Sequence, residues 1–256
     1  MLIWIRTLIY WVGLSFLTTF CFLMILLGCV APHRVRHSFA QAWVKGLLWL
    51  LKHVCGLSYK VVGAENIPDT PSIICSKHQS GWETLALQAI FPPQVFVAKK
   101  ELLWIPFFGW GLALLDTIAI DRSAKTKASQ QIVEQGRDRI AKGYWIAVFP
   151  EGTRTAPGDR GRYQQGAARM AKAFDVPMVP VALNAGEFWP KNAFRKFPGE
   201  ITVVIGPPIL PQDKSSAAMT REAEEWIEAR QQEIGGVGPF AHPDQRKRRL
   251  ADSQPA

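Results

Sequence analysis

The chain has few cysteines, and their spacing excludes the common kinds of metal site. Its four cysteines are Cys21, Cys29, Cys55 and Cys75. They form no C-x-x-C pair and have no histidines at ligand spacing, so the sequence predicts neither a metal site nor another bound cofactor. No internal repeat is present, so a repeat architecture is not predicted.

Acidic residues are in deficit. The chain has 21 Asp and Glu against 30 Lys and Arg, which gives a net charge of +9 at pH 7 and a pI near 9.6. Such an excess suits an anionic membrane surface or an acidic protein partner. Nucleic acid is another partner for a basic chain, but no recognised binding motif is present and the excess is spread along the sequence, so none is predicted.

Charge is absent from Leu8 to Val30. About 20 apolar residues suffice to cross a bilayer core. The run is too long and too aromatic for a typical signal sequence and lacks a small-residue cleavage site, so we expect it to be retained. Arg34 and Arg36 follow it, whereas only Arg6 precedes it, so the positive-inside rule places the rest of the chain in the cytoplasm. Disulfides are not expected in that compartment.

A second apolar stretch runs from Phe39 to Leu57. Lys45 and Lys52 lie seven residues apart in it, and hence on one helical face, which is typical of an interfacial helix. We therefore expect residues 1–57 to form membrane-embedded or interfacial helices. Whether the first of them crosses the bilayer fully stays open.

Apolar runs alternate with helix-like segments beyond residue 58. This pattern predicts an α/β domain over residues 58–210, with a mixed, mostly parallel sheet flanked by helices. The predicted strands are Tyr59–Val62, Ser72–Cys75, Val95–Val97, Thr117–Ile120, Trp145–Phe149, Met178–Leu183 and Ile201–Ile205. The predicted helices are Trp82–Ile90, Ala128–Ala141, Gln165–Phe174 and, within a C-terminal region 211–256, Ala217–Ile234. We expect the basic tail after the last helix to be disordered.

One short stretch places a histidine five residues before a carboxylate. His78 follows an apolar strand, and Glu83 lies in the first turn of the next predicted helix. A turn at Gly81 can bring the two together, as a base and the carboxylate that orients it. Two simpler readings compete: Ser80 and Glu83 fit an S-x-x-E capping box, and a loop histidine can be merely solvated.

A second motif follows the strand that ends near Val148. Phe149-Pro150-Glu151-Gly152-Thr153-Arg154 offers a glycine-containing loop with a threonine and an arginine at a strand end, which suits a phosphate. A turn with a surface arginine is the alternative.

Together these motifs resemble those of the glycerolipid acyltransferase family, specifically the bacterial 1-acyl-sn-glycerol-3-phosphate (lysophosphatidate) acyltransferases. His78 to Glu83 is similar to the family's H-x-x-x-x-D, with Glu in place of Asp. Gly111 through Arg122 is similar to its G-x-x-x-I-x-R block, Phe149 to Arg154 matches F-P-E-G-T-R, and Val179 to Leu183 is similar to its V-P-V block. Four ordered motifs are far more specific than any one.

The resemblance implies transfer of an acyl group from acyl-CoA or acyl carrier protein to the sn-2 hydroxyl of lysophosphatidate, at the cytoplasmic side of a bacterial inner membrane. His78 would be the base and Glu83 its orienting partner. The residues implied for the substrate phosphate are Lys99, Lys100, Arg122, Glu151, Gly152, Thr153 and Arg154. Of the two lysines we favour Lys100. The lysines could instead be a solvated strand end, and Arg122 could pair with Asp121 or Asp116.

Other readings stay open. The extra methylene of Glu83 is read as a working variant, against a degraded relative that only binds lipid. The same motifs would allow another lysolipid as acceptor, such as a lyso-ornithine lipid. Glu101 to Leu115 is strongly apolar and is read as acyl-chain lining or membrane contact, with ordinary core as the alternative.

Overall fold

A computed structural model describes residues 1–28, 33–120 and 125–252. Its seven strands form one sheet in the order β1-β7-β6-β2-β5-β3-β4. They are β1 Leu57–Val62, β2 Ile73–Ser76, β3 Gln94–Lys99, β4 Ile118–Ile120, β5 Trp145–Val148, β6 Met178–Leu183 and β7 Gly199–Ile205. Neighbouring strands are parallel except β6 and β7, so the prediction of a mixed, mostly parallel sheet is confirmed.

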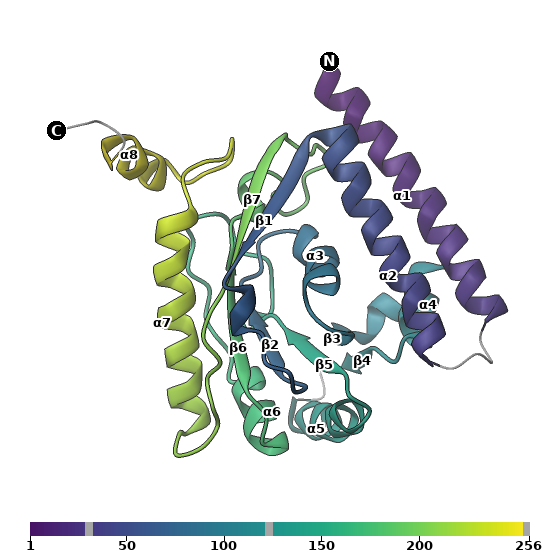
Figure 1. The fold of residues 1–256 in the computed structure, drawn as a ribbon, viewed down its shortest axis with the longest axis vertical. Helices are drawn as coiled ribbons and strands as arrows, with labels where there is room; N and C mark the ends of the chain where they lie inside the picture. The colour runs from purple at the N-terminus through teal and green to yellow at the C-terminus, as the bar shows by residue number, and fades with distance from the viewer. Residues whose placement is uncertain (29–32, 121–124, 253–256) are drawn as a thin grey trace.

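Helices cover both faces of the sheet (Figure 1). They are α1 Leu2–Leu27, α2 His33–Leu50, α3 Trp82–Ile90, α4 Phe108–Leu114, α5 Lys125–Ala141, α6 Gly166–Phe174, α7 Ser216–Ile234 and α8 Pro243–Asp252. Short 3-10 turns lie at Ala64–Asn66, Lys100–Trp104 and Ala185–Glu187.

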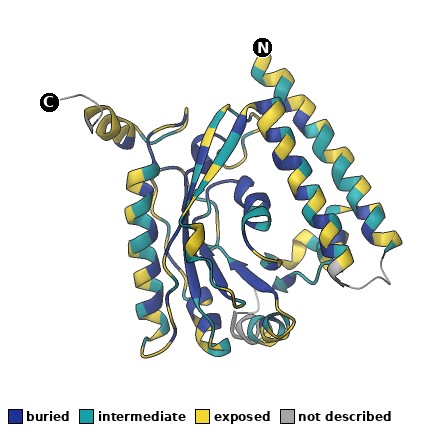
Figure 2. Ribbon diagram, in the orientation of Figure 1, coloured by how far each residue is buried: buried dark blue, intermediate teal, exposed yellow. Residues whose placement is uncertain are grey.

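The central strands are buried on both sides, as Figure 2 shows, because each face packs against helices. Alternate residues of a strand point to opposite faces, so β6 serves two cores. Val179 and Val181 pack with α2 and α3, whereas Met178 and Ala182 pack with α6 and α7. The apolar runs in the sequence follow from this double burial.

Helix α1 is the one described helix that is long and apolar enough to cross a membrane. It packs against α2 and α4 at the edge of the molecule (Figure 1), and its outer face exposes Leu8, Val12 and Phe16. The second predicted helix ends earlier than expected. It closes in a π-helical turn at Leu51–Cys55, and Gly56, with φ 72°, then lets the chain enter β1.

A buried lysine connects α1 to the α/β domain. Lys196 is 1% exposed, and its ammonium lies 3.8 Å from the ring centre of Trp11 on α1 and 4.2 Å from that of Trp189. It donates a hydrogen bond of 2.7 Å to the Phe194 carbonyl. Burial lowers the pKa of Lys196 to about 7, although the two indole faces favour the cation.

The prediction of a disordered C-terminal tail was wrong for 243–252, where helix α8 forms. Its basic residues bind backbone carbonyls: Arg246 donates to Gly238 at 2.7 Å and Arg249 to Gly235 at 3.1 Å. Gln245 is buried and donates to the Gln231 carbonyl at 3.3 Å. The charge run that suggested disorder thus supplies donors that hold the helix on the end of α7.

Candidate active site

The two main motifs meet at one edge of the sheet. Strands β2 and β5 are parallel neighbours, so their carboxyl ends lie side by side. The loop that begins at Lys77 follows β2, and the loop that begins at Phe149 follows β5. Residues separated by about 70 positions in the sequence are therefore brought together by strand pairing alone.

His78 and Glu83 form the contact that their spacing suggests. Nδ1 of His78 lies 2.8 Å from Oε1 of Glu83, which is fully buried in the first turn of α3. The imidazole stacks on Phe149, with ring centres 3.9 Å apart. A carboxylate at Nδ1 favours the tautomer with its proton there, which leaves the Nε2 lone pair for a substrate.

The same carboxylate also caps helix α3. Oε1 of Glu83 accepts backbone hydrogen bonds from Gln79 at 2.7 Å and Ser80 at 2.6 Å, while Ser80 Oγ accepts one from Trp82 at 3.1 Å. Glu83 therefore has both of its predicted roles: it caps helix α3 and it orients His78. Because the cap fixes the carboxylate, it also fixes the ring of His78.

The backbone of His78 is held by the second loop. Its N–H donates to Oε2 of Glu151 at 2.8 Å, and its carbonyl accepts from the Thr155 N–H at 2.8 Å. Glu151 is buried and does not line the cavity beside His78. This geometry gives Glu151 a supporting place rather than the phosphate contact implied by the resemblance, since a carboxylate would repel a phosphate.

A buried lysine, which sequence reasoning missed, completes this support. Lys77 is 1% exposed, and its ammonium lies 2.7 Å from Glu151 Oε1 and 2.8 Å from Glu228 Oε1 on α7. It also donates to the Asp159 carbonyl at 3.0 Å. Lys77 at the end of an apolar strand was a signal that partners were needed, but nothing in the sequence pointed to Glu228.

Burial and negative charge act on the neighbouring side chains. Burial, followed by the nearby charge of Glu151, raises the pKa of the Cys75 thiol to about 12. Burial and Glu228 also raise the pKa of Tyr163, whose hydroxyl donates to Glu228 at 2.9 Å. Both groups stay protonated at neutral pH and are unsuited to act as nucleophiles.

His78 faces a cavity of about 460 Å³. Its cationic lining residues are Lys99, Arg154 and Lys191. Its apolar wall includes Phe96, Leu102, Phe108, Ile120 and Met170. A cation-bearing end and an apolar wall in one cavity suit an amphiphile with an anionic head group.

The predicted phosphate-binding residues are distributed unevenly around this cavity. Gly152, Thr153 and Arg154 line it, with Gly152 at φ 70°, and so does Lys99. Lys100 begins the turn after β3 and is not among the lining residues, so the geometry favours Lys99 over Lys100, the reverse of the sequence-based preference. Arg122 lies outside the described residues.

Lys191 was not predicted. It lies in the loop after β6, and its ammonium is 3.3 Å from Thr153 Oγ1 and 3.4 Å from the Arg154 carbonyl. It is separated from Arg154 by 37 residues, so only the return of the chain to the same sheet edge brings the two cations together.

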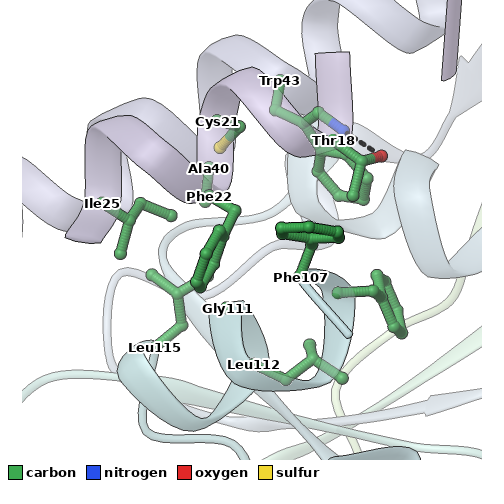
Figure 3. Close-up of a pocket in the computed structure, with 11 residues that line it drawn as sticks. Thr18, Cys21, Phe22, Ile25, Ala40, Trp43, Phe107, Gly111, Leu112 and Leu115 are labelled. Atoms are coloured by element: carbon green, nitrogen blue, oxygen red, sulfur yellow. Dashed lines mark hydrogen bonds between the residues drawn. The ribbon is translucent and has the colours of Figure 1, made fainter. Parts of the chain in front are cut away.

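Different parts of the apolar segment Glu101–Leu115 fit different predictions made for it. Leu102 and Phe108 line the cavity beside His78, whereas Trp104 is 80% exposed. On the other side of the segment, Phe107 lies against Phe22 of α1 in a narrow apolar pocket (Figure 3). The centres of the two rings are 5.4 Å apart. The segment thus joins helix α1 to the active-site cavity.

Comparisons with known proteins relate this chain to acyltransferases. The family model described as Acyltransferase matches residues 58–184. The chain is 42% identical over 220 residues to the 1-acyl-sn-glycerol-3-phosphate acyltransferase of Pseudomonas aeruginosa, a match that covers 84% of this chain and 86% of that protein. It is 30% identical over 191 residues to the human 1-acyl-sn-glycerol-3-phosphate acyltransferase alpha, which covers 73% of this chain and 68% of that protein.

A solved structure shares the fold. The crystal structure of the 1-acyl-sn-glycerophosphate acyltransferase from Thermotoga maritima matches with a TM-score of 0.76 at 22% identity, covering 90% of this chain and 95% of that one. At that identity the likeness shows the fold, while the sequence relatives show the family. With His78 and Glu83 joined at the cavity and the acyltransferase motifs in order, this chain is an enzyme that belongs to the 1-acyl-sn-glycerol-3-phosphate acyltransferase family.

Proposed function

We propose that this enzyme transfers an acyl group from an acyl-CoA or acyl carrier protein thioester to the sn-2 hydroxyl of 1-acylglycerol-3-phosphate, which yields phosphatidate for phospholipid synthesis. The observation that carries the proposal is the contact of 2.8 Å between Glu83 and His78, whose imidazole lines the same cavity as Arg154 and Lys191.

The proposed reaction needs only the two substrates and side chains of the protein. Nε2 of His78 takes the hydroxyl proton as the oxygen attacks the thioester carbonyl, so a C–O bond forms. The C–S bond then breaks, and the imidazolium returns the proton to the leaving thiolate. Glu83 stabilises the imidazolium between these steps. No oxidant, reductant or metal is needed, and we propose that no cofactor takes part.

The head group would be bound through its charge. A phosphate monoester carries nearly two negative charges at neutral pH, and guanidinium and ammonium groups are its usual partners. Arg154 offers a fork, and Lys191 and Lys99 offer point charges around the same cavity. Thr153 adds a hydroxyl, and the family resemblance adds Arg122.

Membrane association supports a lipid acceptor. The exposed apolar face of α1 would lie in the bilayer, and α4 connects it to the cavity. We propose that the protein sits in a bacterial inner membrane with its α/β domain on the cytoplasmic side, from the positive charge that follows the first helix.

Assay of the full chain in mixed micelles tests the proposal. Lysophosphatidate and a lyso-ornithine lipid would be offered in turn, each with acyl-CoA and with acyl carrier protein thioesters. We expect phosphatidate as the main product. A preference for the lyso-ornithine lipid would refute the proposed acceptor. Transfer to neither acceptor would refute the proposed reaction.

A further inference from the structure

A second polar pocket opens beside the active-site cavity, at the start of helix α6. It has a volume of about 340 Å³ and is lined by Arg162, Tyr163, Gln164, Gln165, Gly166 and Arg169. No carboxylate is among these residues. The pocket therefore presents two guanidinium groups with no acidic lining residue to neutralise them.

Both arginines are available to a ligand. Arg162 and Arg169 are exposed, and within the described residues neither guanidinium has a hydrogen bond or ion pair. Arg160 differs, because it pairs with Glu224 at 2.8 Å. Two unpaired guanidinium groups in one concave pocket are suited to a phosphate, which each can bind with two hydrogen bonds.

Backbone groups at the base of the pocket add to this positive field. Gln165 precedes α6 without capping it through its side chain, so the first N–H groups of the helix have no side-chain acceptor. A Cβ built at Gly166 would meet nothing within 4 Å, so the space above the helix start is open to a ligand.

The pocket adjoins the catalytic cavity. Gln164 and Gly166 line both hollows, and the Gln164 N–H donates to the Pro150 carbonyl at 2.8 Å. A flexible arm that passes over these two residues leads from the arginines toward His78. A phosphate bound in the pocket is thus connected to the reacting centre by a shared wall.

The position in the fold separates this pocket from the lipid side. Helix α6 packs on the face of the sheet that also carries α5 and α7, whereas α2 and α3 cover the other face, next to α1 (Figure 1). A water-soluble molecule can approach α6 while a lysolipid approaches along α1 and α4. The phosphate of the lipid would already be bound at Arg154 and Lys191.

We propose that Arg162 and Arg169 bind the phosphate of the acyl donor's phosphopantetheine arm. This inference rests on the proposed function, since it assumes a thioester donor. Coenzyme A and acyl carrier protein both carry that phosphate at the far end of the arm from the thiol. Coenzyme A adds nucleotide phosphates that could use the same two arginines.

The test compares donors with and without phosphate. The double variant Arg162→Gln/Arg169→Gln is assayed in mixed micelles with acyl-CoA, acyl carrier protein thioester and acyl-N-acetylcysteamine, a neutral thioester. We expect the KM for both phosphate-bearing donors to rise about 10-fold or more, with the KM for lysophosphatidate unchanged. Rates with the neutral thioester should equal those of the wild type. Arg221→Gln, an exposed arginine on α7, is the matched control and should change nothing.

Each outcome separates the sources. A rise for both donors supports binding of the shared phosphate. A rise confined to acyl-CoA would overturn it, because the arginines would then bind only the nucleotide phosphates. An unchanged donor KM, an equal loss with the neutral thioester, or a rise in the lysophosphatidate KM would overturn the donor site. Failure of the wild type to acylate lysophosphatidate from any donor would instead refute the proposed function.

Discussion

One carboxylate oxygen of Glu83 both holds the ring of His78 and caps helix α3. Oε1 lies 2.8 Å from Nδ1 and accepts two backbone N–H groups, at 2.7 Å and 2.6 Å. Oε2 is buried without a hydrogen-bond partner in the described part of the chain. The imidazole is therefore oriented by a group whose own position is set by a helix terminus, and removing the carboxylate affects both.

Replacing His78 by alanine should abolish turnover, because no other imidazole and no carboxylate is among the described residues that line the cavity. We expect kcat to fall by about 10³-fold or more, with binding to lipid vesicles unchanged. Initial rates and vesicle flotation measure the two properties. Activity retained above about a tenth of wild type would show that His78 is not the base.

The two duties of Glu83 can be separated by two substitutions. Glu83→Gln keeps an oxygen for the backbone N–H groups but loses the charge that stabilises the imidazolium, so we expect kcat to fall by about 10²-fold or more with little change in Tm. Glu83→Asp keeps the charge but shortens the cap, and should cost about 1 kcal/mol of stability. If the Gln variant lost stability but kept its rate, capping would be the main duty.

Arg154→Ala should raise the KM for lysophosphatidate about 10-fold or more and leave the donor KM unchanged, because a charge-assisted contact with the phosphate is removed. Lys191→Ala should act in the same direction but more weakly, since its ammonium is a point charge rather than a fork. Steady-state kinetics with each substrate varied in turn measure both. Equal effects on acceptor and donor would contradict phosphate binding.

Lys77→Met should destabilise the protein by about 3 kcal/mol or more, because it leaves the buried carboxylate of Glu151 and the partly buried carboxylate of Glu228 without their cation. Loss of the Glu151 position should also lower kcat through the backbone of His78. Thermal unfolding in detergent gives the first quantity and initial rates give the second. Lys60→Met, which removes an exposed ion pair with Glu200, is the control and should change Tm little.

The buried Lys196 predicts a dependence of stability on pH. Its folded-state pKa is lowered from 10.5 to about 7, so between these values the unfolded chain binds a proton that the folded chain does not. Stability should therefore rise with pH across this window, by up to about 1.4 kcal/mol per pH unit, and be insensitive to this group below pH 7. Lys196→Met should remove that slope. Identical slopes from pH 7 to 10 would mean that Trp11 and Trp189 keep the lysine protonated.

The sequence alone determined the α/β class, nearly all strand positions and the identity of His78, Glu83 and Arg154 as site residues to examine. These features are local, because buried strands give continuous apolar runs and short motifs lie where a strand meets a loop. The sequence-based predictions failed where the partners of a residue lie far from it in the sequence. The disorder predicted for the tail ignored the carbonyls that Arg246 and Arg249 reach.

Only the tertiary structure decided which charges meet. Lys77 with Glu228, Lys191 with Thr153, and Lys196 with Trp11 are brought together from separate parts of the chain by strand order and helix packing. The tertiary structure also placed Glu151 inside the protein and Lys99 at the cavity. The spacing of residues along a chain indicates only which of them can touch within one helix, strand or turn. The energy of a buried charge depends on neighbours from other elements, which the fold of the sheet brings close.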